Sequence, residues 1–192
     1  MVALLPGSRP NEVARILPGI VAAAPLIAAR VPDVQFVVAA APNLPVDLFA
    51  AVGPGIVVVQ GRADDVLAAS DVVVTASGTA TVQAALHERP MVVVYRLSKL
   101  TYLIGKPFVK VDTYAMANLV AGRRIVPELI QQDFTPERVA DETVGFLTNS
   151  GRYAEVRDAL REVRHRLGAP GASGRAAASI LEVAARNGAR SA

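Results

Sequence analysis

Short runs of apolar residues, rich in valine, alternate with helical segments along the first 95 residues of the chain. The predicted strands lie at residues 2–5, 35–40, 56–60, 71–75 and 91–95. Runs such as 72–74 are apolar at every position, which is typical of strands that helices cover on both faces of a sheet. Strands that alternate with helices and are buried on both faces predict an open, parallel, Rossmann-like α/β sheet flanked by helices.

Helical spacing of apolar residues fills the intervals between the strands. The first helix, at 12–30, repeats Val13, Ile16, Leu17 and Ile20 on one face. Further helices are predicted at 46–52, 64–69, 79–86, 136–147, 153–167 and 173–186. Residues 97–127 are less regular and predict a long connection that carries short helices, a kind of loop that is often functional.

Composition limits the class of protein. Hydrophobic residues make up 52% and charged residues 19% of the 192 positions, which favours one ordinary globular domain with its own core. The absence of cysteine excludes disulfides and thiolate chemistry. No uninterrupted apolar stretch approaches the roughly 20 residues that span a bilayer, and the N-terminus lacks a signal-peptide pattern. We therefore expect a cytoplasmic protein.

The net charge restricts the class of ligand less than the composition restricts the class of protein. Twenty Lys and Arg against 17 Asp and Glu give a net charge of +3, and the basic residues are scattered. Without a dense basic tract or interleaved aromatic residues, we do not expect nucleic-acid binding. A basic surface suits anionic lipid or a phosphorylated substrate equally well. Residues 97–111 combine apolar side chains with lysines, so they form either a core-packed helix or a segment for an anionic membrane surface.

A turn containing Gly7, Ser8 and Arg9 joins the first predicted strand to the first helix. Backbone N–H groups at a helix start bind anions, glycine permits close approach, and Arg9 can pair with a phosphate through two hydrogen bonds. The alternative is an ordinary turn with a helix cap. Ligands of open α/β sheets bind at the carboxyl ends of strands, and this turn lies at such an end, so its position favours the functional interpretation.

A second loop, Ser77-Gly78-Thr79, follows the fourth predicted strand and opens another helix. Small hydroxyl side chains and glycine at a helix N-terminus offer several donors to a diphosphate, although a simply capped helix is the alternative. Neither loop has the Walker pattern, and no GxGxxG sequence follows the first strand. The two loops together predict a phosphate-bearing ligand of another class.

Several short motifs occur in a specific order and spacing. They are Leu-Leu-Pro-Gly-Ser-Arg at 4–9 with Glu12, Ala-Ser-Asp at 69–71, Ala-Ser-Gly-Thr-Ala at 76–80, Pro-Met-Val-Val-Val-Tyr-Arg at 90–96, Leu-Thr at 100–101, Val-Lys at 109–110, Asn-Leu-Val-Ala-Gly-Arg at 118–123 and Pro-Glu-Leu-Ile-Gln at 127–131. In this succession they resemble the lipid-A-disaccharide synthase family, and the resemblance runs from residue 4 to about residue 183.

The resemblance implies a GT-B glycosyltransferase, in which two Rossmann-like domains face each other across a cleft and the C-terminal one holds the nucleotide sugar. It implies that residues 1–170 are this UDP-sugar-binding domain and that 171–192 form a helix and tail that cross to an N-terminal acceptor domain or pair in a homodimer. Enzymes of the family join UDP-2,3-diacylglucosamine to 2,3-diacylglucosamine 1-phosphate at the inner face of the cytoplasmic membrane, without metal or cofactor. The general base would belong to the N-terminal domain, so this chain by itself is expected to be inactive.

The resemblance also assigns residues to roles. The nucleotide-sugar-binding set would be Gly7, Ser8, Arg9, Ser77, Gly78, Thr79 and Gln83. Arg9 would also neutralise the departing diphosphate, and Asn118 would orient the sugar or phosphate, which makes these two the catalytic candidates. Gln83 stands where the family often carries a glutamate that binds ribose hydroxyls, and it accepts hydrogen bonds less strongly than a carboxylate does.

The other polar residues suggest less. His87 and His165 have no partners at the spacing of a metal site or a catalytic triad, and Asp64 and Asp65 are interpreted as helix caps. Asp112 is a further candidate to face the substrate. Two other functions stay open: another UDP-sugar enzyme of this fold, such as an epimerase or an N-acetylglucosaminyltransferase, and a non-catalytic nucleotide-binding or interaction module.

Overall fold

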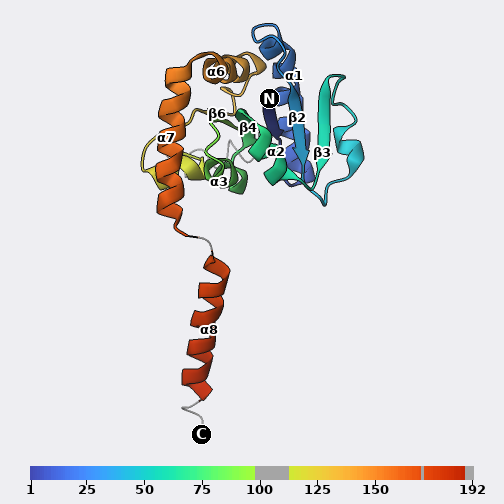
Figure 1. Cartoon of the computed structure of the whole chain (residues 1–192). Coiled ribbons are helices and arrows are strands. Elements are labelled where there is room, and N and C mark those ends of the chain that lie inside the picture. The colour runs from blue at the N-terminus through green and yellow to red at the C-terminus, as the bar shows by residue number, and fades with distance from the viewer. Residues whose placement is uncertain (98–112, 170, 189–192) are drawn as a thin grey trace.

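In the computed structural model the chain forms one parallel six-stranded sheet flanked by helices (Figure 1). The structure describes residues 1–97, 113–169 and 171–188. The strands are β1 (Val2–Leu5), β2 (Phe36–Ala40), β3 (Ile56–Gln60), β4 (Val72–Ala76), β5 (Met91–Tyr95) and β6 (Glu128–Ile130), in the spatial order β3-β2-β1-β4-β5-β6. The predicted open parallel sheet is confirmed.

Strand β6 was not among the predicted strands. It has three residues and only Leu129 among them is buried, so it carries no alternating or continuous apolar pattern. Its pairing with β5, in which Val94 lies beside Leu129, defines it as a strand. A tertiary contact therefore assigns a strand that the sequence pattern could not show.

The helices are α1 (Pro10–Ala28), η1 (Val46–Phe49), α2 (Ala63–Ala69), α3 (Thr79–Leu86), α5 (Met116–Ala121), α6 (Pro136–Thr148), α7 (Ser150–Leu167) and α8 (Ala172–Gly188). Helix α1 begins two residues before its predicted start, and Pro10 suits the first helical turn. Helix α5 lies within the predicted long connection. The predicted segments at 98–112 lie outside the described residues.

The chain runs outward from β1 through β2 to β3, then returns to the other side of β1 and continues through β4 and β5 to β6. With right-handed crossovers, this reversal puts the helices of the two halves on opposite faces of the sheet. Helix α1 thus lies on one face and α3, which packs with α2, α5 and α7, on the other, and α6 returns after β6 to the face of α1 and packs on it. Strands β1 and β4 pair in register, with Leu5 beside Thr75, so the loops that follow them start side by side.

Helix α1 belongs to the core. By length and apolar composition it could cross a membrane, a test that the core helices of globular proteins also pass. Its buried face holds Val13, Ile16, Leu17, Ile20, Ala23, Ala24 and Ile27. No other helix in the described part of the chain meets that test. Contact with α6 and burial against the sheet account for the apolar face of α1.

Helix α8 differs from the other helices because it extends away from the sheet (Figure 1). Its apolar side chains Ile180, Leu181 and Val183 are 68%, 69% and 59% exposed. The preceding helix α7, by contrast, buries Val156, Ala159, Leu160 and Val163. The predicted helix at 173–186 is thus present, and its apolar side chains are exposed to solvent in this structure.

Candidate functional site

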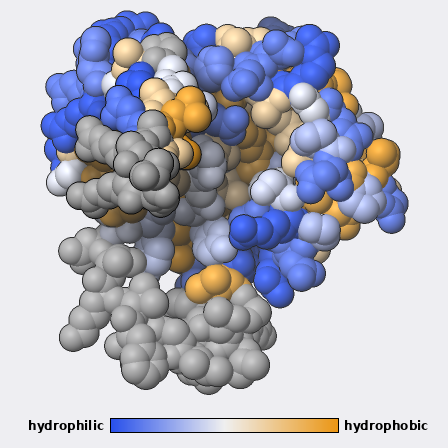
Figure 2. Space-filling view, turned by 90° about the horizontal axis from the view of Figure 1, so that it is seen from below, coloured by the Kyte–Doolittle hydropathy of each residue, from blue (hydrophilic) through white to orange (hydrophobic). Residues whose placement is uncertain are grey.

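A cavity of about 260 Å³ opens at the carboxyl ends of β1 and β4. It is lined by Leu5, Gly7, Ser8, Arg9, Glu12, Ala39, Ala41, Ala63, Ala76, Ser77, Gly78, Thr79, Ala80 and Gln83. The face seen from below in Figure 2 is hollowed near its centre, with apolar residues at the base of the hollow and polar residues around it. All seven residues predicted to bind a nucleotide sugar are therefore in the lining of one cavity, brought together by the pairing of β1 with β4.

The first loop turns sharply at Gly7, which has a φ of 119°. The Glu12 side chain packs against this turn, and its Oε2 accepts a hydrogen bond from the Ser8 N–H at 3.0 Å. A Cβ on Gly7 would lie 2.2 Å from that oxygen, so the Glu12 side chain would have to move, and the positive φ by itself favours glycine at this position. Glu12 thus shapes the loop from one helical turn away.

Arg9 is the residue before the first turn of α1 and is exposed at the cavity. Within the described ranges, its guanidinium has no hydrogen-bond or ion-pair partner. A free guanidinium beside a helix N-terminus is a strong site for a phosphate, because charge and hydrogen-bond donors point to the same place.

The second loop passes through Gly78, whose φ is 148°, into helix α3 at Thr79. Ser77 lines the cavity, but the protein uses both of its donors. Its N–H donates to the Val94 carbonyl at 3.0 Å, and its hydroxyl donates to the Tyr114 carbonyl at 2.8 Å. The Thr81 N–H donates to the Gly78 carbonyl at 3.0 Å, so the donors left for a ligand among the described residues are the N–H groups of Gly78, Thr79 and Ala80 and the Thr79 hydroxyl.

Gln83 lies one helical turn after Thr79 and also lines the cavity. Its side-chain amide has no partner among the residues that the structure describes. It is therefore free to bind a hydroxyl-bearing group next to an anion held at the start of α3.

Asn118 occupies a different place from the other predicted site residues. It is 1% exposed and is not part of the cavity lining formed by the described residues. Its Nδ2 donates to the Val126 carbonyl at 3.0 Å and to Glu128 Oε1 at 2.7 Å. Its Oδ1 accepts from the N–H groups of Ile125 and Val126 at 2.8 and 3.0 Å. An amide has two donors and room for two acceptor bonds, so the protein itself saturates this side chain, and the predicted contact with sugar or phosphate is not made from this position.

A sequence profile described as lipid-A-disaccharide synthetase matches residues 1–181. The chain belongs to the lipid-A-disaccharide synthetase family. It is 45% identical over 186 residues to the lipid-A-disaccharide synthase of Myxococcus xanthus (strain DK1622), covering 95% of this chain and 49% of that protein. The synthase of Geobacter sulfurreducens is 40% identical over 187 residues, with the same two coverages. The chain therefore spans about half the length of the curated relatives it matches, and that part is their C-terminal half.

Solved structures share the fold of this lipid-A-disaccharide synthetase domain. The calicheamicin glycosyltransferase CalG4 superposes with a TM-score of 0.62 at 18% identity, over 94% of this chain and 41% of that one. The glycosyltransferase VinC, solved in complex with dTDP, gives 0.62 at 17% identity, over 96% and 41%. The fold is thus that of one domain of a GT-B glycosyltransferase, as the sequence predicts.

Asp64, Asp65, His87 and His165 lie outside the cavity lining. Asp64 and Asp65 are in the first turn of α2 but do not cap it: Asp65 pairs with Arg62 at 2.8 Å and Asp64 with His87 at 3.3 Å. Their charges still suit the positive end of the helix dipole. His165 lies in the last turn of α7. Asp112 is outside the described residues.

Among the described residues, no group of three or more His, Cys, Asp or Glu side chains could hold a metal ion. The cavity lining also contains apolar residues that the sequence interpretation did not assign to the site, and one charged residue, Glu12, which is part of the first motif. The signal that could have identified it is its place one helical turn after Gly7-Ser8-Arg9, on the side of α1 that continues the anion-binding turn.

Proposed function

We propose that this chain is the donor-binding half of a glycosyltransferase that joins UDP-2,3-diacylglucosamine to 2,3-diacylglucosamine 1-phosphate in the synthesis of lipid A. The observation that carries the proposal is the cavity between β1 and β4, where the N-terminus of α3 and Arg9, which has no partner in the described part of the chain, face one space. Such a pair of groups suits a diphosphate, and membership of the family supplies the choice of UDP-sugar.

The chemistry of this site is electrostatic. As the acceptor oxygen attacks the sugar, the bond to the diphosphate breaks and negative charge grows on the leaving UDP. Arg9 and the N–H groups that open α3 offset that charge, and preorganised groups of this kind usually make the largest contribution to catalysis. Gln83 binds the ribose, and Gly7 and Gly78 let the backbone come close to the phosphates.

The acceptor hydroxyl needs a general base within hydrogen-bond reach, which we assign to an N-terminal acceptor domain. Residues 171–192 cross to that domain, and the exposure of Ile180, Leu181 and Val183 supports this assignment. Pairing of α8 in a homodimer is the competing use of the same surface. Because both substrates are acylated, the complete enzyme works in the cytoplasm at the inner face of the membrane.

Calorimetric titration of the chain with UDP and with UMP tests the donor site. We expect UDP to bind at least about tenfold more tightly than UMP, because the second phosphate adds charge-assisted hydrogen bonds. Equal affinity for the two nucleotides would contradict a diphosphate site. Adding the N-terminal half of a relative should then restore release of UDP from the donor, and binding without any turnover in that mixture would support a non-catalytic nucleotide-binding module instead.

A further inference from the structure

The carboxylate of Glu128, the first residue of β6, lies beside the start of helix α5. Its Oε2 accepts a hydrogen bond from the Tyr114 N–H at 2.8 Å, and its Oε1 accepts from the Ala115 N–H at 2.9 Å. Ala115 is the N-cap residue of α5, which has no side-chain cap of its own. A carboxylate from a neighbouring strand therefore caps this helix, where a negative charge also suits the helix dipole.

Asn118 holds the same carboxylate from the other side. It donates to Glu128 Oε1 at 2.7 Å and binds the chain at Ile125 and Val126, which leads into β6. Glu128 in turn pairs with Val93 in β5. The start of α5 is thus fixed to the sheet through one half-buried carboxylate and one buried amide.

Tyr114 connects the hydrogen-bonded pair of Glu128 and Asn118 to the candidate donor site. The Tyr114 carbonyl accepts the hydroxyl hydrogen of Ser77 at 2.8 Å, while its N–H is the group held by Glu128. The other donor of Ser77 goes to Val94 in β5. The loop that opens α3 is therefore tied at two points, one to the sheet and one to Tyr114, and Glu128 sets the position of the second.

We propose that Glu128 is a positioning residue of the donor site, which acts with Asn118 through Tyr114 and Ser77 to hold the Ser77–Thr79 loop in the shape that binds the diphosphate. The proposal rests on the donor-binding function proposed above. It gives Asn118 a role in the site without contact with the ligand. The Ser77 hydroxyl donates its hydrogen to the Tyr114 carbonyl, so Ser77 contributes by shaping the loop. The N–H groups of Gly78 and Thr79 then hold the phosphate.

Glu128→Gln tests this role, because the variant keeps the size of the side chain but replaces one acceptor oxygen with an NH₂ group. We expect the Kd for UDP to rise about tenfold, since hydrogen bonds to charged groups are worth that much or more. Glu142→Gln is the matched control: Glu142 is a carboxylate of 29% side-chain exposure that pairs with Arg152 away from the cavity. It should leave the Kd for UDP within about twofold, because it removes a carboxylate of comparable burial without touching the loop. An unchanged Kd in Glu128→Gln, or equal weakening in both variants, would overturn the proposal.

A double-mutant cycle with Ser77→Ala tests the route of the effect. If Glu128 acts through the Ser77 hydroxyl, then Glu128→Gln introduced into Ser77→Ala should weaken UDP binding by no more than about twofold, because the connection is already broken. Additive effects would show that Glu128 influences binding by another path and would overturn the assignment of Tyr114 and Ser77 as the link.

Amide hydrogen exchange without any ligand tests the positioning claim independently of UDP binding. The Ser77 N–H, bonded to Val94, should exchange about tenfold faster in Glu128→Gln than in the parent, relative to the Leu4 amide in the sheet, and not in Glu142→Gln. Failure of the parent chain to bind UDP would contradict the proposed function. An unchanged exchange rate at Ser77 would end the positioning claim, so the two failures are distinguishable.

Discussion

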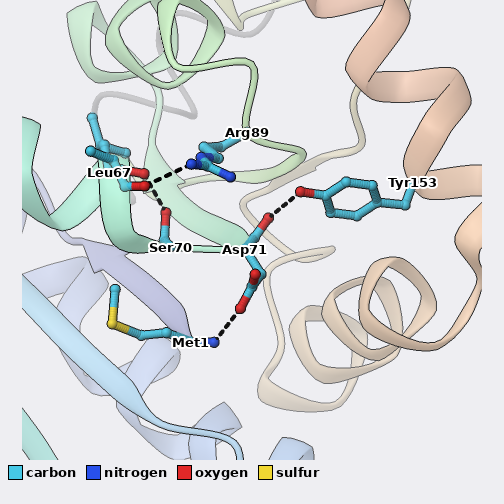
Figure 3. Close-up of polar contacts among 7 residues, drawn as sticks. Met1, Leu67, Ser70, Asp71, Arg89 and Tyr153 are labelled. Carbon is cyan, nitrogen blue, oxygen red and sulfur yellow. Dashed lines mark hydrogen bonds and ion pairs between the residues drawn. The ribbon is translucent and has the colours of Figure 1, made fainter.

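The side of the sheet where the parallel strands begin, called here the amino edge, and the side where they end, the carboxyl edge, differ in what their polar groups bind. At the amino edge, around the start of β4, the side chains drawn in Figure 3 bind protein partners, mostly backbone carbonyls, although the buried Nε of Arg89 has no partner among the described residues. The Arg89 Nη2 donates to the Ala68 carbonyl at 2.6 Å, and the Ser70 hydroxyl donates to the Leu67 carbonyl at 2.9 Å. The Tyr153 hydroxyl donates to the Asp71 carbonyl at 3.3 Å. These bonds satisfy the last carbonyls of α2 and secure the start of β4.

At the carboxyl edge the same strands end at the cavity, and several polar groups there are free. Within the described ranges, Arg9 and Gln83 have no side-chain partner, and the N–H groups that open α3 point out of the helix. The direction of the βα unit explains part of this difference, because it brings helix N-termini to the carboxyl edge and helix C-termini to the amino edge. We therefore expect the amino edge to contribute to stability and the carboxyl edge to bind a ligand.

The substitution with the largest expected effect is Gly7→Ala, because it should lower both stability and binding at the carboxyl edge. The positive φ and the approach of Glu12 make a side chain unfavourable there, so we expect a loss of about 2 kcal/mol in the free energy of unfolding, together with loss of UDP binding. Urea denaturation and nucleotide titration measure the two effects. Gly53→Ala is the control, since an added Cβ there meets no atom within 4 Å. Similar stability losses in both variants would mean that Gly7 has no special requirement.

Arg9→Ala should separate binding from stability. We expect the Kd for UDP to rise about 30-fold, equivalent to about 2 kcal/mol for a charge-assisted phosphate contact, with an unchanged melting temperature. Arg15→Ala removes the same charge from an exposed position of the same helix, outside the cavity lining formed by the described residues. If Arg15→Ala weakens UDP binding as much as Arg9→Ala does, the effect is one of net charge, and the site assignment for Arg9 is wrong.

Ser70→Ala and Ser8→Ala form a matched pair across the two edges. Ser70 is buried and its hydroxyl satisfies the Leu67 carbonyl, so its removal should lower the free energy of unfolding by about 1 kcal/mol and leave UDP binding unchanged. Ser8 is exposed in the cavity lining, so its removal should change stability by less than about 0.5 kcal/mol and weaken UDP binding. Thermal unfolding and titration of both variants check the contrast. The opposite assignment of effects would refute the distinction between the edges.

The smallest expected effect is that of Gln83→Glu. A carboxylate accepts hydrogen bonds from ribose hydroxyls more strongly than an amide does, but it also repels the diphosphate, so we expect a gain in UDP affinity of only about threefold. The measurement is a comparison of UDP with 2′-deoxy-UDP on the parent and the variant. The gain should be smaller for the deoxynucleotide, and an equal gain for both would show that Gln83 does not face the ribose 2′-hydroxyl.

The sequence determined the alternation of strands and helices, because continuous apolar strands and helical periodicity are local signals of burial. It also determined the two loops that line the cavity. Gly7 and Gly78 follow strands of a predicted parallel sheet, and they adopt positive-φ conformations that favour glycine. Residues chosen from these loops all lie in one cavity because β1 and β4 pair in register, a consequence of the fold class itself.

Only the tertiary structure decided the place of side chains that bind partners remote in sequence. Strand β6 exists through its pairing with β5, and Asn118 points into the interior because Val126 and Glu128 saturate its amide. A motif identifies a polar residue type, but whether that residue faces a ligand or the protein depends on which backbone groups need a partner nearby. Those groups lie in the segment 125–128, and only the hydrogen bonds between this segment and Asn118 of α5 bring them together.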